Sequence, residues 1–317
     1  MEQTLIGLDI GGTKTEALLV NETLTPQTQL RQPTTAKHPE RLLANLITTI
    51  DKAVAQAKVH PRSVTGIGIG IPGQVNPETG EVKTAVNLNI DRLALGRMLN
   101  QTYGIPIFVD NDMHTAAQGI YHYLNQHGES VSSLAYLGIG TGIAAGIILN
   151  GELHSGQQQM AGEIGHIVFQ EDGPRCKCGQ HGCLEAIASG PAIVAQANKI
   201  IDGYIIHTPK DLYDLADTGY FPAQLAVTRI SKSIARAIQL LLLTYDVEKV
   251  VIGGGVARLG DQLLQPILKE LNQLQQQSLL ARRMLAPAKV TVIPADFNPG
   301  LWGAIHLAQQ GLQRIAA

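Results

Sequence analysis

Four potential metal ligands are concentrated in one short stretch of this 317-residue sequence, GHIVFQEDGPRCKCGQHGC. They are His166, Cys176, Cys178 and Cys183, and the chain has no other cysteine. One imidazole and three thiolates form the closed tetrahedral donor set of a structural zinc site. The C-x-C-x4-C spacing differs from the usual zinc knuckle, and His181 is a rival fourth ligand. The odd number of cysteines argues against a disulfide framework.

Two acidic residues flank this stretch. Glu163 lies three residues before His166, and Glu185 lies two residues after Cys183. A metal that folds the loop would bring both carboxylates close to the imidazole. Carboxylates that accept hydrogen bonds from neighbouring hydroxyl groups suit sugar recognition. Alternatively, each Glu only supports the metal ligands from outside the coordination shell.

A second group of polar residues, Asp110, Asn111 and Asp112, follows the apolar run PIFV. An Asp at the junction of a strand and a helix is a good helix cap, which needs no catalytic role. The functional interpretation is that Asp112 accepts the proton of an attacking sugar hydroxyl, which typically accelerates such a reaction by about 10²- to 10⁴-fold. Asn111 would then orient the sugar.

Three glycine-rich turns, each directly after a predicted strand, suit phosphate binding, because glycine lets backbone N–H groups approach a ligand closely. Lys14 would add positive charge, and Asp9 could hold the hydrated Mg²⁺ that bridges the phosphates of ATP. Alternatively, the turns are structural and Asp9 accepts hydrogen bonds from turn amides. The turns contain Gly11, Gly12 and Thr13; Gly140, Thr141 and Gly142; and Gly253, Gly254 and Gly255.

Two other nucleotide-binding motifs are excluded. GIGIPG at 68–73 matches G-x-G-x-x-G, but Pro72 and the turn residues that follow replace the helix that a dinucleotide fold requires. The P-loop pattern G-x-x-x-x-G-K-[ST] does not occur. Any nucleotide site is therefore of the hairpin type.

The elements that must position these residues alternate between strands and helices, which predicts an α/β fold. The strand, glycine turn, strand pattern occurs twice, so we expect two related halves that each offer a phosphate-binding turn. Strands are predicted at 4–10, 15–20, 64–72, 106–110, 133–140, 143–150 and 249–253, and helices at 38–58, from 230 onward and after Pro299.

Composition narrows the function class. The length of 317 residues favours two domains, and the 44% apolar and 4% aromatic content is typical of an α/β protein. With 24 basic and 26 acidic residues the net charge is −2. No basic stripe is evident in the sequence, so we do not expect a nucleic-acid partner. No apolar run reaches the roughly 18 residues of a membrane span, and no signal peptide is evident, so we expect a cytoplasmic protein.

These motifs together resemble the ROK family (repressors, open reading frames, sugar kinases) of the actin, hexokinase and heat-shock ATPase superfamily. The resemblance is nearly full-length, from IGLDIGGTKT through GIGIPG, VDND, LGIGTGIAAG, GEIGH and CKCGQHGCLE to VIGGG. It implies two ribonuclease-H-like (actin-like ATPase) domains around a central cleft. We expect a smaller lobe of residues 1–112 plus 302–317 and a larger lobe of residues 113–301 that carries a zinc loop at 163–185.

The resemblance also implies a function, the ATP-dependent phosphorylation of a free hexose, with glucose and its 6-hydroxyl as the first expectation. Fructokinase, N-acetylglucosamine kinase and N-acetylmannosamine kinase are the alternatives. ATP would bind the glycine turns, Mg²⁺ would lie near Asp9, Asp112 would be the general base, and the protein would form a homodimer. His166 is favoured over His181 as zinc ligand, and the expected hydroxyl contacts are Asn111, Glu163, His166 and Glu185.

The sequence departs from the family pattern in places. Met113 and His114 follow Asp112 where N-D-A-N is frequent, and Ala144 and Ala145 occupy positions where a glycine is common. NLNID replaces N-L-P-G-W, which leaves Asn87 as the remnant of that sugar loop. These departures bear on affinity and sugar choice more than on the reaction.

Two other function classes compete with the kinase. ROK repressors carry a winged helix-turn-helix module before the same core, whereas only five residues precede Ile6 here, so we expect a kinase. A chaperone-like or actin-like ATPase would account for the glycine turns but not for the zinc loop.

Overall fold

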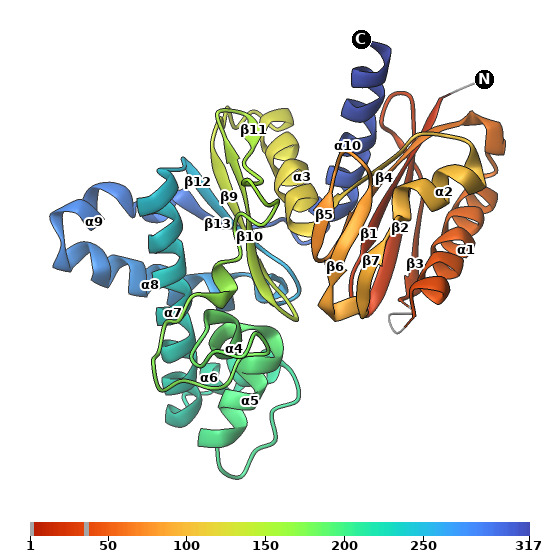
Figure 1. The fold of residues 1–317 in the computed structure, drawn as a ribbon. Helices are drawn as coiled ribbons and strands as arrows, with labels where there is room; N and C mark the ends of the chain where they lie inside the picture. Colours follow the sequence, from red (N-terminus) through yellow and green to blue (C-terminus); the bar gives the residue numbers. More distant parts are fainter. Residues whose placement is uncertain (1–2, 35–37) are drawn as a thin grey trace. The chain divides into compact units, whose positions relative to one another are not determined.

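The structure is a computed structural model that describes residues 3–34 and 38–317, and it divides into two compact units (Figure 1). Unit 1 contains the described residues of Met1–Ser130, together with Ser155–Met160 and Asn298–Ala317. Unit 2 contains Val131–His154 and Ala161–Phe297. Each unit has its own five-stranded sheet and its own hydrophobic core.

The sheet of unit 1 has the order β3-β2-β1-β4-β8. β1 and β2 form the predicted hairpin, β3 pairs antiparallel with β2, and β4 and β8 continue the sheet in parallel. The strands are β1 Thr4–Ile10, β2 Lys14–Asn21, β3 Pro26–Pro33, β4 Val64–Ile71 and β8 Ile107–Asn111.

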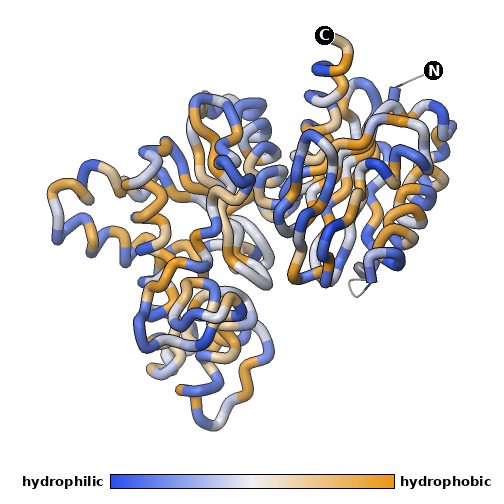
Figure 2. Tube along the Cα trace, viewed as in Figure 1, coloured by the Kyte–Doolittle hydropathy of each residue, from blue (hydrophilic) through white to orange (hydrophobic). Residues whose placement is uncertain are grey.

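Helices cover both faces of this sheet, as the side-chain alternation along β1 shows. Ile6 and Leu8 share a core with α1 (Pro39–Ala57), whereas Leu5 packs with residues of α10 (Pro299–Ala316). Successive strand residues point to opposite faces, so α1 and α10 lie on opposite sides of the sheet. Orange and blue segments alternate along α1 in Figure 2, as expected for a helix with one apolar face. α3 (Asp112–Gln126) packs against α10.

A small three-stranded sheet lies between β4 and β8 in the sequence, where we predicted only turns. Its strands pair antiparallel in the order β5-β6-β7 and lead into α2. The strands are too short to show a clear two-residue alternation, which is why the sequence pattern missed them. The elements are β5 Gln74–Asn76, β6 Glu81–Ala85, η2 Val86–Leu88, β7 Ile90–Leu93 and α2 Leu95–Tyr103; η1 Pro61–Ser63 precedes β4.

The sheet of unit 2 has the order β11-β10-β9-β12-β13 and repeats the pattern of unit 1. β9 and β10 form a hairpin, β11 extends it antiparallel, and β12 and β13 add in parallel. The expected internal repetition is thus confirmed at the level of topology. The strands are β9 Leu134–Ile139, β10 Ile143–Leu149, β11 Glu152–Leu153, β12 Lys249–Gly253 and β13 Val290–Val292.

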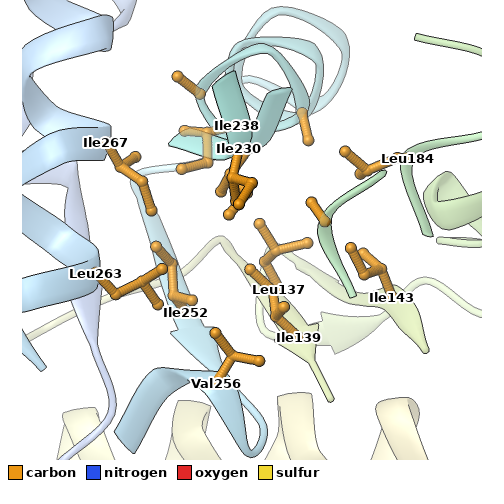
Figure 3. Close-up of a cluster of buried hydrophobic side chains, with 14 of the residues drawn as sticks. Leu137, Ile139, Ile143, Leu184, Ile230, Ile238, Ile252, Val256, Leu263 and Ile267 are labelled. Atoms are coloured by element: carbon orange, nitrogen blue, oxygen red, sulfur yellow. The ribbon is translucent and has the colours of Figure 1, made fainter. Parts of the chain in front are cut away.

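The core of unit 2 is aliphatic. Figure 3 shows Leu137 and Ile252 from neighbouring strands packed with Ile230 and Ile238 of α7 and Ile267 of α8. The helical elements are η3 Ile164–His166, α4 Leu184–Ala188, α5 Gly190–Ile200, α6 Pro209–Asp217, α7 Phe221–Tyr245, η4 Val256–Leu259, α8 Asp261–Gln277, α9 Leu279–Met284 and η5 Pro287–Lys289.

The structure confirms the predicted α/β class with two ribonuclease-H-like (actin-like ATPase) units. The start of one predicted helix differs: α7 begins at Phe221 rather than near residue 230. Pro222 lies in its first turn, where its missing N–H has no helical partner to lose. The lobe boundaries expected at residues 112 and 302 stay a prediction. Among the described residues, no helix is both long and apolar enough to cross a membrane.

Candidate active site

The junction between β8 and α3 places three of the predicted residues side by side. Asn111, not an Asp, is the N-cap of α3: its Oδ1 accepts hydrogen bonds from the backbone N–H groups of Met113 (2.8 Å) and His114 (3.3 Å). Its Nδ2 donates to the carbonyl of Gly73 at 2.9 Å. Asn111 is buried, so most of its hydrogen-bonding capacity serves the helix start.

Asp112 is the first residue of α3 and is partly exposed. Its Oδ1 lies 3.0 Å from the backbone N of Met113, and its carbonyl accepts a hydrogen bond from the Thr115 hydroxyl at 2.9 Å. Because Asn111 supplies the cap, the capping alternative does not account for this carboxylate. The N-terminus of a 15-residue helix also favours a negative charge at this position.

Asp9 lies near the end of β1, next to the N-terminus of α10. A Cβ atom at Gly300 would lie only 2.8 Å from Asp9 Cγ, so the glycine creates the space for this carboxylate. Burial is the largest influence on Asp9 and raises its pKa to about 6, while Lys14 opposes the shift. A partly buried carboxylate without full charge compensation suits a bound cation, so the position fits the predicted Mg²⁺ site.

Two residues that we did not predict complete this cluster. Glu16 is buried and forms an ion pair with Lys14. Asn298 is the N-cap of α10, and its Nδ2 donates to Glu16 Oε2 at 3.1 Å. The residues are 282 positions apart in the chain, so no local pattern could have joined them. Lys14 is therefore held by Glu16 rather than extended from the turn.

The first glycine turn is closed by a hydrogen bond from Gly11 N to Lys14 O at 2.8 Å. Gly12 and Thr13 are exposed at its tip. A Cβ atom at Gly12 would lie 3.8 Å from the carbonyl oxygen of Asn87. The structure therefore brings Asn87, which is exposed in η2, next to this turn.

The two glycine turns of unit 2 are adjacent. A Cβ atom at Gly140 would lie 3.9 Å from Gly255 N, and one at Gly254, which has a φ of +82°, would lie 2.4 Å from the carbonyl of Ile139. Thr141 is exposed beside them. Only glycine fits at position 254, because both its φ and the close strand forbid a side chain.

Glu185 contacts the glycine turn between β9 and β10, which contains Gly140, Thr141 and Gly142. Its Oε2 accepts a hydrogen bond from the N–H of Ile143 at 3.0 Å, and a Cβ atom at Gly142 would lie 2.6 Å from the same oxygen. Glu185 is in the first turn of α4, two residues after Cys183. The structure thus joins the end of the cysteine loop to the second glycine turn.

The GEIGH segment lies against β10. The N–H of Ala145 donates to the carbonyl of Gly162 at 2.8 Å. A Cβ atom at Gly162 would lie 1.8 Å from Ala145 O, and one at Gly165 would lie 1.9 Å from Ile143 O. The two glycines therefore let Glu163 and His166 approach the strand, a role that the sequence analysis did not recognise.

The four predicted metal ligands converge. The ligand atoms of His166, Cys176, Cys178 and Cys183 all lie within 4.8 Å of one another. Cys176 Sγ is 3.6 Å from His166 Nδ1, and Cys178 Sγ is 3.6 Å from Cys183 Sγ. A tetrahedral zinc ion with Zn–S bonds of about 2.3 Å needs ligand atoms about 3.7 Å apart. Donor types and spacing therefore fit zinc.

The two nitrogens of His166 face different groups. Nδ1 lies in the cysteine cluster, whereas Nε2 is 4.0 Å from Glu163 Oε2. His181 lies outside the cluster, with its Nδ1 3.4 Å from the carbonyl of Gly173. This geometry selects His166 over His181 and leaves its Nε2 directed toward Glu163.

The thiols differ in environment. A hydrogen bond from the backbone N–H of Gln180 is the main cause that lowers the pKa of exposed Cys178 to about 7. Burial is the main cause that raises the pKa of Cys183 to about 12. A bound dication would hold all three sulfurs as thiolates, because metal binding displaces the protons.

Known proteins resemble this chain over most of its length. A glucokinase from Halalkalibacterium halodurans is 32% identical over 276 residues, which cover 83% of each chain. An N-acetylmannosamine kinase from Salmonella newport is 31% identical over 311 residues, 96% of this chain and 98% of that one. A xylose repressor from Caldicellulosiruptor bescii is 32% identical over 247 residues, and this match spans 61% of the repressor.

A solved structure agrees with these matches. The ROK family glucokinase from Streptomyces griseus, in complex with glucose and AMPPNP, superposes with a TM-score of 0.79 and 29% identity, covering 97% of this chain and all of that one. The sequence profile of the ROK family matches residues 5–311. The chain belongs to the ROK family.

Proposed function

We propose that the protein is an ATP-dependent hexose kinase that phosphorylates glucose at its 6-hydroxyl. The observation that carries this proposal is the position of Asp112 at the start of α3, where Asn111 supplies the helix cap in its place. The Asp112 carboxylate follows the carboxyl end of a parallel strand, and α/β proteins place ligand-binding groups at such strand ends. The similarity to glucokinases adds the expected substrate.

In this proposal Asp112 accepts the proton of the sugar hydroxyl. The hydroxyl oxygen bonds to the γ-phosphorus of ATP at the same time, and the bond between that phosphorus and ADP breaks. Charge on the transferred group is stabilised by backbone N–H groups of the glycine turns. These are the turns at Gly11, Gly12 and Thr13, at Gly140, Thr141 and Gly142, and at Gly254 and Gly255. Lys14 would contribute positive charge beside the first turn, although its ion pair with Glu16 offsets part of that charge.

Asp9 would hold Mg²⁺ through water, and the ion, when bound, neutralises charge on the phosphates. Asn298 and Gly300 keep the Asp9 carboxylate at this position from the α10 side. The Cys₃His cluster would hold structural zinc and order the segment that carries Glu163, His166 and Glu185. These three residues, with Asn87 and Asn111, are the proposed contacts to sugar hydroxyls.

Fructose, N-acetylglucosamine and N-acetylmannosamine are the competing substrates, the last supported by the similarity to an N-acetylmannosamine kinase. One substituent on a sugar changes binding in an apolar pocket by only about 1 to 3 kcal/mol, so the proposed catalytic residues do not by themselves distinguish among the four sugars. A homodimer stays a prediction that light scattering after gel filtration tests directly.

The deciding experiment measures ADP release with each of the four sugars for the wild type and for Asp112→Asn. We expect glucose to give the highest kcat/KM and Asp112→Asn to lower kcat by about 10²- to 10⁴-fold while glucose binding persists. Asp261→Asn is the matched control, because Asp261 is the exposed first residue of α8. An Asp112→Asn variant with near-normal turnover would refute the assigned base.

The similarity to a xylose repressor makes a sugar-responsive DNA-binding protein the competing function. Such a protein would bind sugar but would not release ADP. Specific, salt-sensitive binding to an operator, together with absent phosphoryl transfer on all four sugars, would support it over the kinase.

A further inference from the structure

A buried polar pair flanks the proposed base in the sequence. His114 Nδ1 is 2.9 Å from Asp110 Oδ1, and the two residues are only 2% and 4% exposed. Because a carboxylate oxygen accepts, His114 supplies the hydrogen from Nδ1. Asp112 lies between these two residues in the sequence. No role was expected for this pair, since His114 appeared only as a departure from the family pattern.

The pair spans the junction that carries Asp112. Asp110 Oδ1 also accepts a hydrogen bond from the backbone N–H of Asn111 at 2.7 Å. The same oxygen therefore ties the last residue of β8 to the first turn of α3. Asn111 Oδ1 in turn accepts from the backbone of His114 at 3.3 Å. The strand end and the helix start are thus joined from both directions.

Close packing fixes the opposite side of this turn. A Cβ atom at Gly70 would lie 2.4 Å from Thr115 Oγ1, and one at Gly303 would lie 1.6 Å from the Thr115 carbonyl. β4 and α10 therefore contact the turn at its third residue after Asp112 without intervening side chains. On the other side, the Asp110–His114 pair and the Asn111 cap are the hydrogen bonds that hold the first residues of α3.

Stability alone does not explain why a polar pair is buried at this junction. Replacing a buried polar or ionic pair with well-packed apolar side chains is often neutral or even stabilising. Fixed geometry at a reacting group, in contrast, has a large effect, because a misplacement of about 1 Å can lower a rate by about 10²-fold. Such a pair can therefore contribute more through geometry than through stability.

We propose that the Asp110–His114 pair is a positioning device that holds the Asp112 carboxylate in its working orientation. This inference rests on the proposed kinase function. His114 acts through Asp112 and does not itself contact the substrate.

Two amide substitutions of His114 test whether a hydrogen-bond donor is needed at the position of Nδ1 or whether any polar side chain is sufficient. In His114→Asn the amide nitrogen takes the place of Nδ1 and can still donate to Asp110, whereas in His114→Gln it takes the place of Nε2 and cannot. We expect His114→Gln to lower kcat by about 10- to 100-fold with little change in glucose KM, and His114→Asn to remain within about threefold of the wild type. His306→Gln is the matched control, since His306 is also a buried histidine but lies on α10. It should retain the wild-type kcat.

A double variant tests whether the effect passes through the base. If it does, adding His114→Gln to Asp112→Asn lowers kcat no further than Asp112→Asn alone. The proposal is overturned if His114→Gln has the wild-type kcat, if His114→Asn loses as much as His114→Gln, or if the two substitutions multiply.

Hydrogen exchange of the peptide over residues 110–118 gives a readout that does not depend on activity. The proposal expects faster exchange in His114→Gln than in His114→Asn and the wild type, and equal exchange in all three overturns it. A wild type that phosphorylates no hexose would instead contradict the proposed function, and the exchange result would still decide whether the pair holds the turn.

Discussion

Glu185 Oε2 accepts a 3.0 Å hydrogen bond from the backbone N–H of Ile143, the first residue of β10. This contact links the helix that follows the cysteine loop to the glycine turn between β9 and β10. A side chain at Gly142 would force this carboxylate to move, because a Cβ atom there would lie 2.6 Å from the same oxygen. One carboxylate thus contacts a proposed phosphate-binding turn while belonging to the proposed sugar-binding set.

Substitution of Glu185 by Gln separates these two roles. The amide oxygen of Gln can still accept from Ile143, so the turn keeps its geometry, but the charge is lost. A charged hydrogen bond is worth about 1.5 to 3 kcal/mol, so we expect glucose KM to rise about 10- to 100-fold with the KM for ATP unchanged. Steady-state kinetics with each substrate varied in turn provide the measurement. An unchanged glucose KM would assign Glu185 to the turn alone.

Removal of one thiol tests the metal cluster. Cys178 is the exposed member, so Cys178→Ser disturbs packing least. We expect loss of bound zinc, a lower melting temperature and a higher glucose KM together, because metal binding supplies folding free energy to this loop. Zinc content by mass spectrometry and thermal unfolding are the measurements.

The control for this variant is His181→Ala, which changes the rival histidine in the same loop. His181 lies outside the ligand cluster, so the variant protein should keep its zinc. Zinc loss in His181→Ala, or a zinc-free Cys178→Ser protein with wild-type kinetics, would contradict the assignment.

Gly300→Ala tests the position of Asp9. The new Cβ would lie 2.8 Å from Asp9 Cγ, and such overpacking costs about 1 to 3 kcal/mol, whereas Ala gains about 1 kcal/mol in helix propensity over Gly. We expect a net loss of stability and a severalfold higher Mg²⁺ concentration for half-maximal activity, because Asp9 must move. Gln313→Ala, on the exposed end of the same helix, should change neither. Normal Mg²⁺ dependence in Gly300→Ala would separate Asp9 from the metal.

Two stacked histidines, half-buried His122 on α3 and buried His306 on α10, predict a pH dependence of stability. His306 stacks on His122 with ring centroids 3.9 Å apart, and burial is the main cause that lowers the pKa of His306 to about 4. The unfolded chain, with a histidine pKa of about 6.5, binds protons first as pH falls. The free energy of unfolding should therefore decrease from about pH 6.5 to pH 4, by about 2 kcal/mol at pH 5 from His306 alone.

Burial lowers the pKa of His122 as well, so both rings act in the same direction. Urea unfolding at pH 7.5 and pH 5 provides the measurement. His306→Gln should reduce the difference between the two pH values. An unchanged difference would show that other groups dominate acid unfolding.

Local patterns were sufficient for the elements whose signal is periodic or glycine-marked. The hairpin over β1 and β2, helix α1 and the repeat over β9 and β10 all appear where they were expected, because each has its own apolar period or turn chemistry. The three-stranded sheet of β5 to β7 did not appear in the prediction. Its strands are held by antiparallel partners rather than by a pattern of their own.

For the candidate site, too, some features followed from the sequence and others depended on the tertiary structure. The sequence by itself determined which chemistry is present: the Cys₃His donor set, the carboxylates at Asp9 and Asp112, and the glycine turns, since residue type and spacing limit what each group can do. Only the tertiary structure decided between His166 and His181, assigned the helix cap to Asn111, and joined Asn298 to Glu16 and Glu185 to Ile143. These contacts join residues from different elements, and their distances depend on how strands and helices pack, which no local sequence pattern contains.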